Sequence, residues 1–122
     1  MEKRRDIRFQ TKLYVRLKSE TLTSWGLLID VSVNGVFLQC NRDFPAGTHI
    51  ELEIFMPDNS VSFLKGIVKR KVLMPDTSRK YGLGVALTEK GTLFSHFLRL
   101  LQEQIASRAK TSSAVQEHHT TV

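Results

Sequence analysis

The sequence has little that would support a secreted, disulfide-stabilised or membrane-spanning protein. Its single cysteine, Cys40, cannot form an internal disulfide or anchor a thiolate zinc cluster, so we interpret it as a small buried or half-buried strand residue. The longest apolar stretches, 25–29 and 36–38, fall far short of the about 20 residues that a membrane-spanning helix needs. The N-terminus is charged and no apolar segment follows it, which argues against a secretory signal. We therefore expect a cytoplasmic protein without a membrane span.

The sequence also lacks the usual marks of catalytic and metal sites. It has no G-x-S-x-G motif and no glycine-rich loop opening a helix. Its four histidines are scattered, and no carboxylate or cysteine lies beside them at metal-ligand spacing. Glu51 and Glu53 point the same way on one predicted strand, which is more typical of a solvated strand face than of a glycosidase pair. We predict no enzyme activity, no metal and no cofactor.

What the sequence does contain is typical of one basic globular domain. Its 122 residues are 41% hydrophobic and 25% charged, close to the averages for a folded domain. The 18 Lys and Arg residues exceed the 12 Asp and Glu residues, which gives a net charge of +6. This balance favours an anionic partner such as a nucleotide, a nucleic acid, a phosphate or an acidic membrane surface.

Alternating apolar and polar residues predict a chain built mainly from short β-strands. Turn residues separate the segments, above all Asn34-Gly35, 45–47 and 57–59. We expect the Asn-Gly turn to use the left-handed backbone region, which both residues tolerate. Gly66 lies inside the longest segment and predicts a bulge or sharp bend there. The predicted strands are 12–18, 23–29, 36–40, 49–55, 61–73 and 81–87.

The period changes after the last predicted strand, where apolar residues recur at steps of three and four. This is typical of an amphipathic helix, with Thr92 as the expected N-cap and Thr88 as an alternative. Six strands followed by one helix predict a mainly β fold, a small antiparallel barrel with the helix packed on it. The predicted boundaries are an arm over 1–10, the barrel with its helix over 11–108 and a disordered tail over 109–122.

Two groups of residues could bind such an anionic partner. The arm carries Arg4, Arg5 and Arg8, with Arg4 and Arg8 spaced R-x-x-x-R. An arginine offers a planar fork of donors suited to a phosphate or to the O6/N7 edge of guanine.

The second group follows the second predicted strand, where Asp30, Ser32 and Gly35 form D-x-S-x-x-G. The Asp30 carboxylate can accept from the adjacent N1–H and N2–H₂ donors of guanine, and the Ser32 hydroxyl can donate and accept. Gly35 lets a ligand approach the backbone closely. Together the two groups fit a guanine nucleotide with exposed phosphodiesters.

The R-R-D-I-R segment and the D-V-S-V-N-G segment together resemble the two-part signature of PilZ domains, bacterial receptors for cyclic di-GMP. The resemblance covers about residues 4–101, and it includes the Gly-x-Gly-Val segment at 82–85. It implies a six-stranded antiparallel PilZ-type β-barrel with a C-terminal α-helix. It also implies that cyclic di-GMP is the ligand and that the N-terminal arm wraps around it. The ligand-binding residues implied are Arg4, Arg5, Arg8, Asp30, Ser32 and Gly35.

By the same resemblance, the protein would relay the level of this second messenger to an unidentified downstream protein. Lys3 precedes the arginine motif, and the resemblance implies that a cation at this position favours a stacked pair of ligands over one. The main alternative is a PilZ-fold interaction adaptor that does not bind nucleotide. Binding of single-stranded nucleic acid is less favoured, because Phe9, Tyr14, Phe37 and Phe63 look core-bound or isolated.

Overall fold

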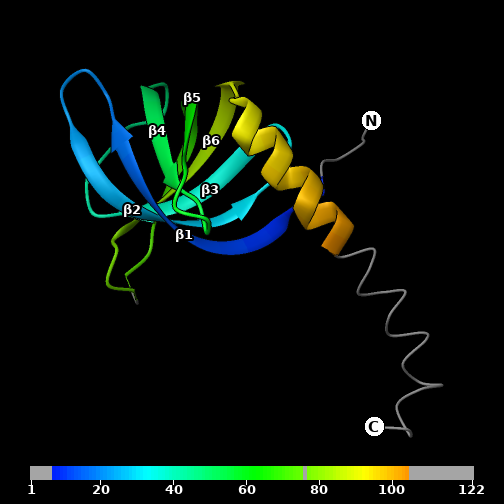
Figure 1. The fold of residues 1–122 in the computed structure, drawn as a ribbon. Helices are drawn as coiled ribbons and strands as arrows, with labels where there is room; N and C mark the ends of the chain where they lie inside the picture. Colours follow the sequence, from blue (N-terminus) through cyan, green and yellow to red (C-terminus); the bar gives the residue numbers. More distant parts are fainter. Residues whose placement is uncertain (1–6, 76, 105–122) are drawn as a thin grey trace, which may run out of the picture.

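The computed structural model describes residues 7–75 and 77–104, which fold into a closed antiparallel β-barrel with a helix beside it (Figure 1). The order of the strands around the barrel is β1-β2-β3-β6-β5-β4. Within these residues, no helix is long and apolar enough to cross a bilayer. The strands are β1 (Phe9–Lys18), β2 (Thr23–Val31), β3 (Gly35–Cys40), β4 (His49–Phe55), β5 (Val61–Leu73) and β6 (Tyr81–Glu89), and the helix covers 92–104.

The predicted mainly β barrel with a C-terminal helix is confirmed, and β4 and β5 have the predicted bounds. β1 begins earlier than predicted, at Phe9, because that side chain packs in the hydrophobic core and is only 6% exposed. Phe9 and Gln10 therefore belong to the barrel rather than to the predicted arm over 1–10. The predicted tail over 109–122 lies outside the described residues.

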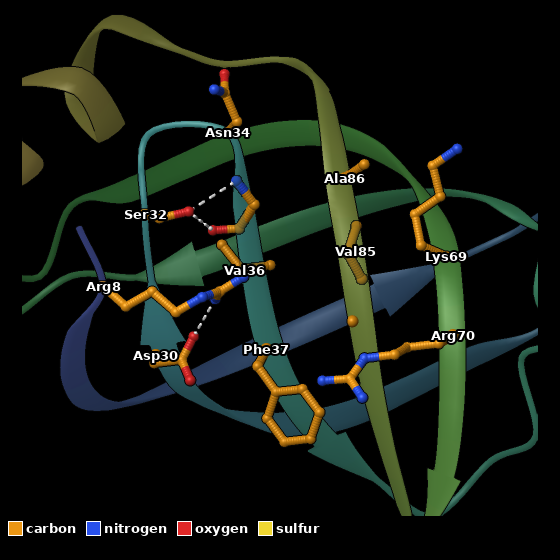
Figure 2. A pocket seen from close by; sticks show the side chains of 12 residues that line it. Arg8, Asp30, Ser32, Asn34, Val36, Phe37, Lys69, Arg70, Val85 and Ala86 are labelled. Atoms are coloured by element: carbon orange, nitrogen blue, oxygen red, sulfur yellow. Dashed lines mark hydrogen bonds and ion pairs between the residues drawn. The ribbon is translucent and has the colours of Figure 1, made fainter. Parts of the chain in front are cut away.

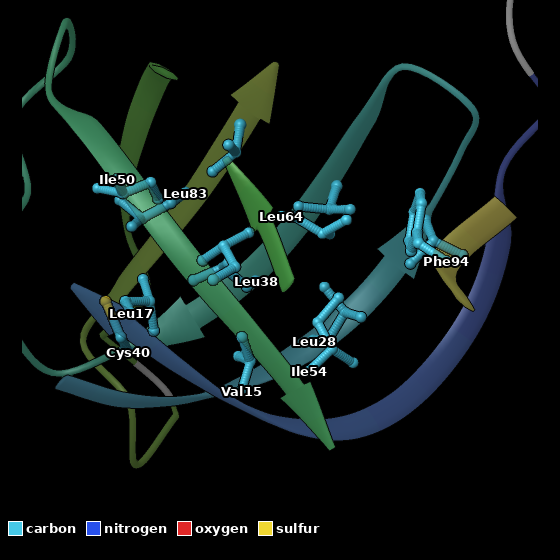
Figure 3. Packing of buried hydrophobic residues seen from close by; sticks show 14 of the residues in the cluster. Val15, Leu17, Leu28, Leu38, Cys40, Ile50, Ile54, Leu64, Leu83 and Phe94 are labelled. Carbon is cyan, nitrogen blue, oxygen red and sulfur yellow. The ribbon is translucent and has the colours of Figure 1, made fainter. Parts of the chain in front are cut away.

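The barrel interior is filled by the apolar residues that alternate along each strand (Figure 3). Successive strand residues point to opposite faces, so one apolar set faces inward while the polar set faces outward. Cys40 lies in this core, as predicted, and its thiol donates to the Arg42 carbonyl at 3.3 Å. Burial raises the pKa of the Cys40 thiol, which keeps it protonated and unreactive. Fully buried strand residues include Val15, Leu17, Leu28, Leu38, Leu52 and Leu83.

The bulge predicted at Gly66 is confirmed by a register shift between Lys65 and Gly66 in the pairing of β5 with β6. A Cβ atom at Gly66 would lie 2.6 Å from the Ala86 carbonyl oxygen and 2.7 Å from Val85 Cγ1. Glycine therefore lets β5 approach β6 at this bend. The same pairing has a second shift, between Val68 and Arg70, which the sequence analysis did not predict.

The helix begins at residue 92, after a turn that differs from the predicted cap. The Gly91 carbonyl accepts a hydrogen bond from the Ser95 N–H at 3.2 Å, so Gly91 occupies the N-cap position. Thr92 is thus the first helical residue rather than the cap, and Thr88 still belongs to β6.

The helix packs on the barrel through the apolar stripe predicted from the sequence. Phe94 is fully buried and Leu98 is nearly so, while Phe97 and Leu101 are half-buried against the same core. Figure 1 shows the helix lying along the side of the barrel at which β1 begins. The helix therefore covers apolar residues at that end of the barrel.

Several aromatic side chains lie on the outside of the barrel. The sequence left these side chains as core-bound or isolated; Tyr14 on β1 is 61% exposed and Phe63 on β5 is 65% exposed, so neither is core-bound. The sequence does not decide whether Trp25 belongs to the core or to the surface. In the structure Trp25 is 59% exposed and stacks on Phe55, with ring centroids 5.4 Å apart. These side chains make one outer face of β2, β1, β4 and β5 partly aromatic.

We expect Ser62→Ala to raise the free energy of unfolding by about 1 kcal/mol. Ser62 is almost fully buried, and its hydroxyl is the one buried side-chain polar group in the described residues without a hydrogen-bond partner. Urea denaturation measures the change. The matched control is Ser24→Ala, because the buried Ser24 hydroxyl donates to the Trp25 carbonyl at 3.0 Å and its loss should destabilise the protein. Equal destabilisation by both variants would contradict the prediction.

Candidate functional site

The largest hollow near the predicted site residues is a trough on the outer surface of the barrel, with a volume of about 520 Å³ (Figure 2). Arg8, the end of β2, the loop after it and the start of β3 form one side of the trough. Residues of β5 and β6 form the other side. The trough is lined by Arg8, Asp30, Ser32, Asn34, Gly35, Val36, Phe37, Lys69, Arg70, Gly84, Val85 and Ala86.

Arg8 and Asp30 meet at one side of the trough, although 22 residues separate them in the chain. Arg8 Nη1 donates to Asp30 Oδ1 at 2.7 Å. The Arg8 and Asp30 side chains are 57% and 24% exposed, so a ligand can reach both groups. The structure thus brings together one residue from each of the two motifs that the sequence analysis singled out.

Ser32 lines the trough, but its hydroxyl is used inside the loop that follows β2. The Ser32 hydroxyl donates to the Gly35 carbonyl at 3.0 Å and accepts from the Gly35 N–H at 3.1 Å. The Ser32 N–H also donates to the Gly35 carbonyl at 2.8 Å. Because the side chain is 1% exposed, it shapes the loop rather than offering a free hydroxyl.

Gly35 is required for a different reason from the one predicted. In the described residues, positive φ angles occur at Gly47 and Asn59, so neither Asn34 nor Gly35 uses the left-handed region. A Cβ atom at Gly35 would instead lie 3.0 Å from the Val85 carbonyl oxygen. Glycine at this position therefore allows the start of β3 to approach β6 closely.

The loop is also tied to the segment that leads into the helix. The Leu87 N–H donates to the Asn34 carbonyl at 2.9 Å, and Lys90 Nζ donates to Asn34 Oδ1 at 3.2 Å. These bonds fix the loop relative to the end of β6. This side of the trough is thus held from two directions, by the Ser32 hydroxyl and by the β6 backbone.

Lys69 and Arg70, on the other side of the trough, were missed by the sequence analysis. The available signal was three consecutive cations, Lys69, Arg70 and Lys71, in an otherwise alternating strand. The register shift between Val68 and Arg70 lets consecutive residues line one hollow, which regular alternation would not predict. Phe37 also lines the trough and was not predicted as a site residue.

The charge of the trough suits an anionic ligand. Its described lining residues include three cations, Arg8, Lys69 and Arg70, and one carboxylate, Asp30. The predicted site residues Arg4 and Arg5 lie outside the described residues. Across the described part of the chain, no three His, Cys, Asp or Glu side chains come together to hold a metal ion.

Comparisons with known proteins agree with the observed fold. The family model described as PilZ domain matches residues 2–103. A solved structure of the Bacillus subtilis inhibitor of motility (MotI/DgrA) is 20% identical, with a TM-score of 0.68, covering 90% of this chain and 53% of that chain. The chain thus spans about half the length of that protein. A structure of the PilZ domain of Escherichia coli YcgR with c-di-GMP is 20% identical, with a TM-score of 0.60, covering 91% of this chain and 96% of that chain. No curated protein sequence matches.

Proposed function

The chain belongs to the PilZ domain family, and from this premise we propose that it is a bacterial cytoplasmic receptor for cyclic di-GMP and not an enzyme. The observation that carries the proposal is the meeting of Arg8 with Asp30 at 2.7 Å on an open trough. The loop held by Ser32 and Gly35 forms the neighbouring wall. The YcgR PilZ domain, which shares this fold, is described in a structure with this ligand.

The chemistry of the trough matches a guanine dinucleotide. The Asp30 carboxylate can accept from the N1–H and N2–H₂ donors of a guanine base, a pair of charge-assisted hydrogen bonds. Arg8 can present its fork to a phosphodiester or to the O6/N7 edge of guanine. Cyclic di-GMP has two phosphodiester charges, and the described lining residues have an excess of cations. Ser32 contributes by holding the loop in shape.

The remaining parts of the proposal concern the arm and the response. Arg4 and Arg5 would add cations to the ligand, which would hold around itself the part of the predicted arm over 1–10 that precedes β1. Ordering a segment costs conformational entropy, which several charge-assisted contacts must exceed. The position of the ordered arm would then change the surface that an unidentified partner protein contacts, by a shift in population rather than by catalysis.

Isothermal titration of the full chain with cyclic di-GMP tests the proposed function. We expect a saturable binding heat with a dissociation constant at or below the order of tens of micromolar. GMP and GTP should compete poorly, because neither carries two guanines and two phosphodiesters in one ring. A flat trace at that ligand concentration would reject the proposal. The fitted stoichiometry also tests the predicted binding of a stacked pair.

One observation favours a second candidate function, a protein-interaction adaptor that does not bind nucleotide. Tyr14, Trp25 and Phe63 are exposed on β1, β2 and β5, with β4 between β1 and β5, and aromatic residues are enriched at protein interfaces. The two functions are separated by combining two measurements. A flat titration together with co-purification of a partner in the absence of nucleotide would favour the adaptor.

A further inference from the structure

We propose that Arg70 is a ligand-contacting residue that makes the trough specific for a cyclic dinucleotide over a mononucleotide. Arg70 forms the wall opposite Arg8 and Asp30, and it contacts the half of the ligand that these two residues do not hold. This inference rests on the proposed function, because it assigns a role within the same trough.

The two walls lie on different strands. Around the closed barrel, β3 and β6 separate β2, which carries Asp30, from β5, which carries Arg70. Three intervals between neighbouring strands correspond to about 14 Å along the curved surface. A ligand that touches both Asp30 and Arg70 must therefore span the whole trough.

A bulge in β5 directs Arg70 toward this trough. Val68 pairs with Val85, and Arg70 pairs with Gly84, so Lys69 is an extra residue between the two pairs. Val68 is fully buried, whereas Lys69 and Arg70 are both exposed and both line the trough. In a regular strand the residue after Lys69 would point back into the barrel.

The Arg70 side chain can lie across β6 because Gly84 has no side chain there. A Cβ atom at Gly84 would lie 3.2 Å from Arg70 Cγ and 3.3 Å from Arg70 Nε. Figure 2 shows the guanidinium of Arg70 extending over β6 toward the side of the trough where Phe37 lies. Within the described residues, no carboxylate pairs with Arg70, whereas Arg8 and Arg16 each have one.

The consequence for specificity follows from the size of the ligand. A mononucleotide held by Arg8 and Asp30 has one base and occupies one side of the trough. A cyclic dinucleotide has a second base and a second phosphodiester, which extend to the other side. Arg70 can stack on a base or present its fork to a phosphodiester, so its contribution is made only with the larger ligand.

The test is displacement of fluorescently labelled cyclic di-GMP from the full chain by unlabelled cyclic di-GMP and by GMP at up to millimolar concentration. We expect Arg70→Ala to weaken cyclic di-GMP binding by at least about tenfold, with no change for GMP. Arg70→Lys should recover only part of this loss, because a lysine has the charge without the planar fork. Arg42→Ala, which removes the same charge from an exposed loop outside the trough, should have no effect.

A second variant separates the position of Arg70 from its charge. Gly84→Ala keeps Arg70 but pushes its flexible side chain away from β6, since the atoms in the way are Arg70 Cγ and Nε. We expect about a threefold or larger loss for cyclic di-GMP, in the same direction as Arg70→Ala. Circular dichroism checks that both variants retain the barrel.

The outcomes distinguish this inference from the function on which it rests. If the unmodified chain binds cyclic di-GMP and Arg70→Ala binds it equally well, the inference is overturned and the receptor function stands. Equal losses for cyclic di-GMP and GMP would overturn the specificity role. If the unmodified chain binds no cyclic di-GMP, the receptor function and this inference both fail.

Discussion

Arg8→Ala is expected to weaken cyclic di-GMP binding by at least about tenfold, because a good bidentate contact of an arginine contributes about 1–3 kcal/mol. Arg8 is the described arginine of the R-x-x-x-R motif, and it lines one side of the trough with its guanidinium 2.7 Å from the Asp30 carboxylate. Its removal takes a cation from the ligand and leaves Asp30 without the partner that orients it. The measurement is isothermal titration of the variant.

The same substitution should barely change stability, which keeps the result interpretable. The Arg8–Asp30 pair is on the surface, with Arg8 57% exposed, and exposed ion pairs contribute about 0–1 kcal/mol. Arg16→Ala is the matched control, because Arg16 makes a similar pair with Glu53 at 2.9 Å on another part of the barrel. We expect Arg16→Ala to leave the affinity unchanged. An Arg8→Ala variant with the affinity of the unmodified chain would show that Arg8 does not hold the ligand, and the same result for Arg4→Ala would show that the arm does not hold it.

Phe94→Ala is expected to lower the free energy of unfolding by about 3–5 kcal/mol. Phe94 is fully buried in the core cluster together with Phe9 and Leu98, so its truncation leaves a cavity where the helix joins the barrel. Domains of this size are stable by about 5–15 kcal/mol, so the loss is a large fraction of the total. Chemical denaturation followed by circular dichroism measures it.

Two companion variants make the Phe94 result specific. Leu93→Ala removes a neighbouring apolar side chain that is 45% exposed, and it should cost less than about 1 kcal/mol. Phe94→Leu preserves most of the apolar volume and should cost less than Phe94→Ala. If Phe94→Ala and Leu93→Ala have the same small effect, the helix contributes little to the stability of the barrel.

Much of the fold could be predicted because its residues alternate clearly and its turns are marked. In β4, Ile50, Leu52 and Ile54 face inward and the residues between them are polar, so pattern and structure agree from Ile50 to Ile54. The start of β1 was missed because Arg8 precedes Phe9 in a charge-dense segment. The burial of Phe9 depends on the core around it, which no local pattern shows.

Part of the site could be predicted because some of its residues belong to local sequence motifs. Asp30, Ser32 and Gly35 belong to a local motif, and Arg8 to another, so the sequence could identify them as candidates. Arg70 could not be found in this way, because its position depends on a bulge in the pairing of β5 with β6 and on Gly84 across the strand. The reason why position 35 requires glycine could not be predicted from the sequence either. It depends on the close approach to the Val85 carbonyl and not on φ.

The closed ladder of hydrogen bonds restricts how another molecule can be recognised. Each strand pairs with two neighbours in the order β1-β2-β3-β6-β5-β4, so the backbone donors and acceptors of the paired residues are already used, although β1 pairs with β4 only over residues 15–18. Where strands are paired on both sides, a partner cannot dock by β-augmentation unless the wall opens. There, selectivity must come from outward-pointing side chains, which can diversify during evolution while the inward-pointing set preserves the fold.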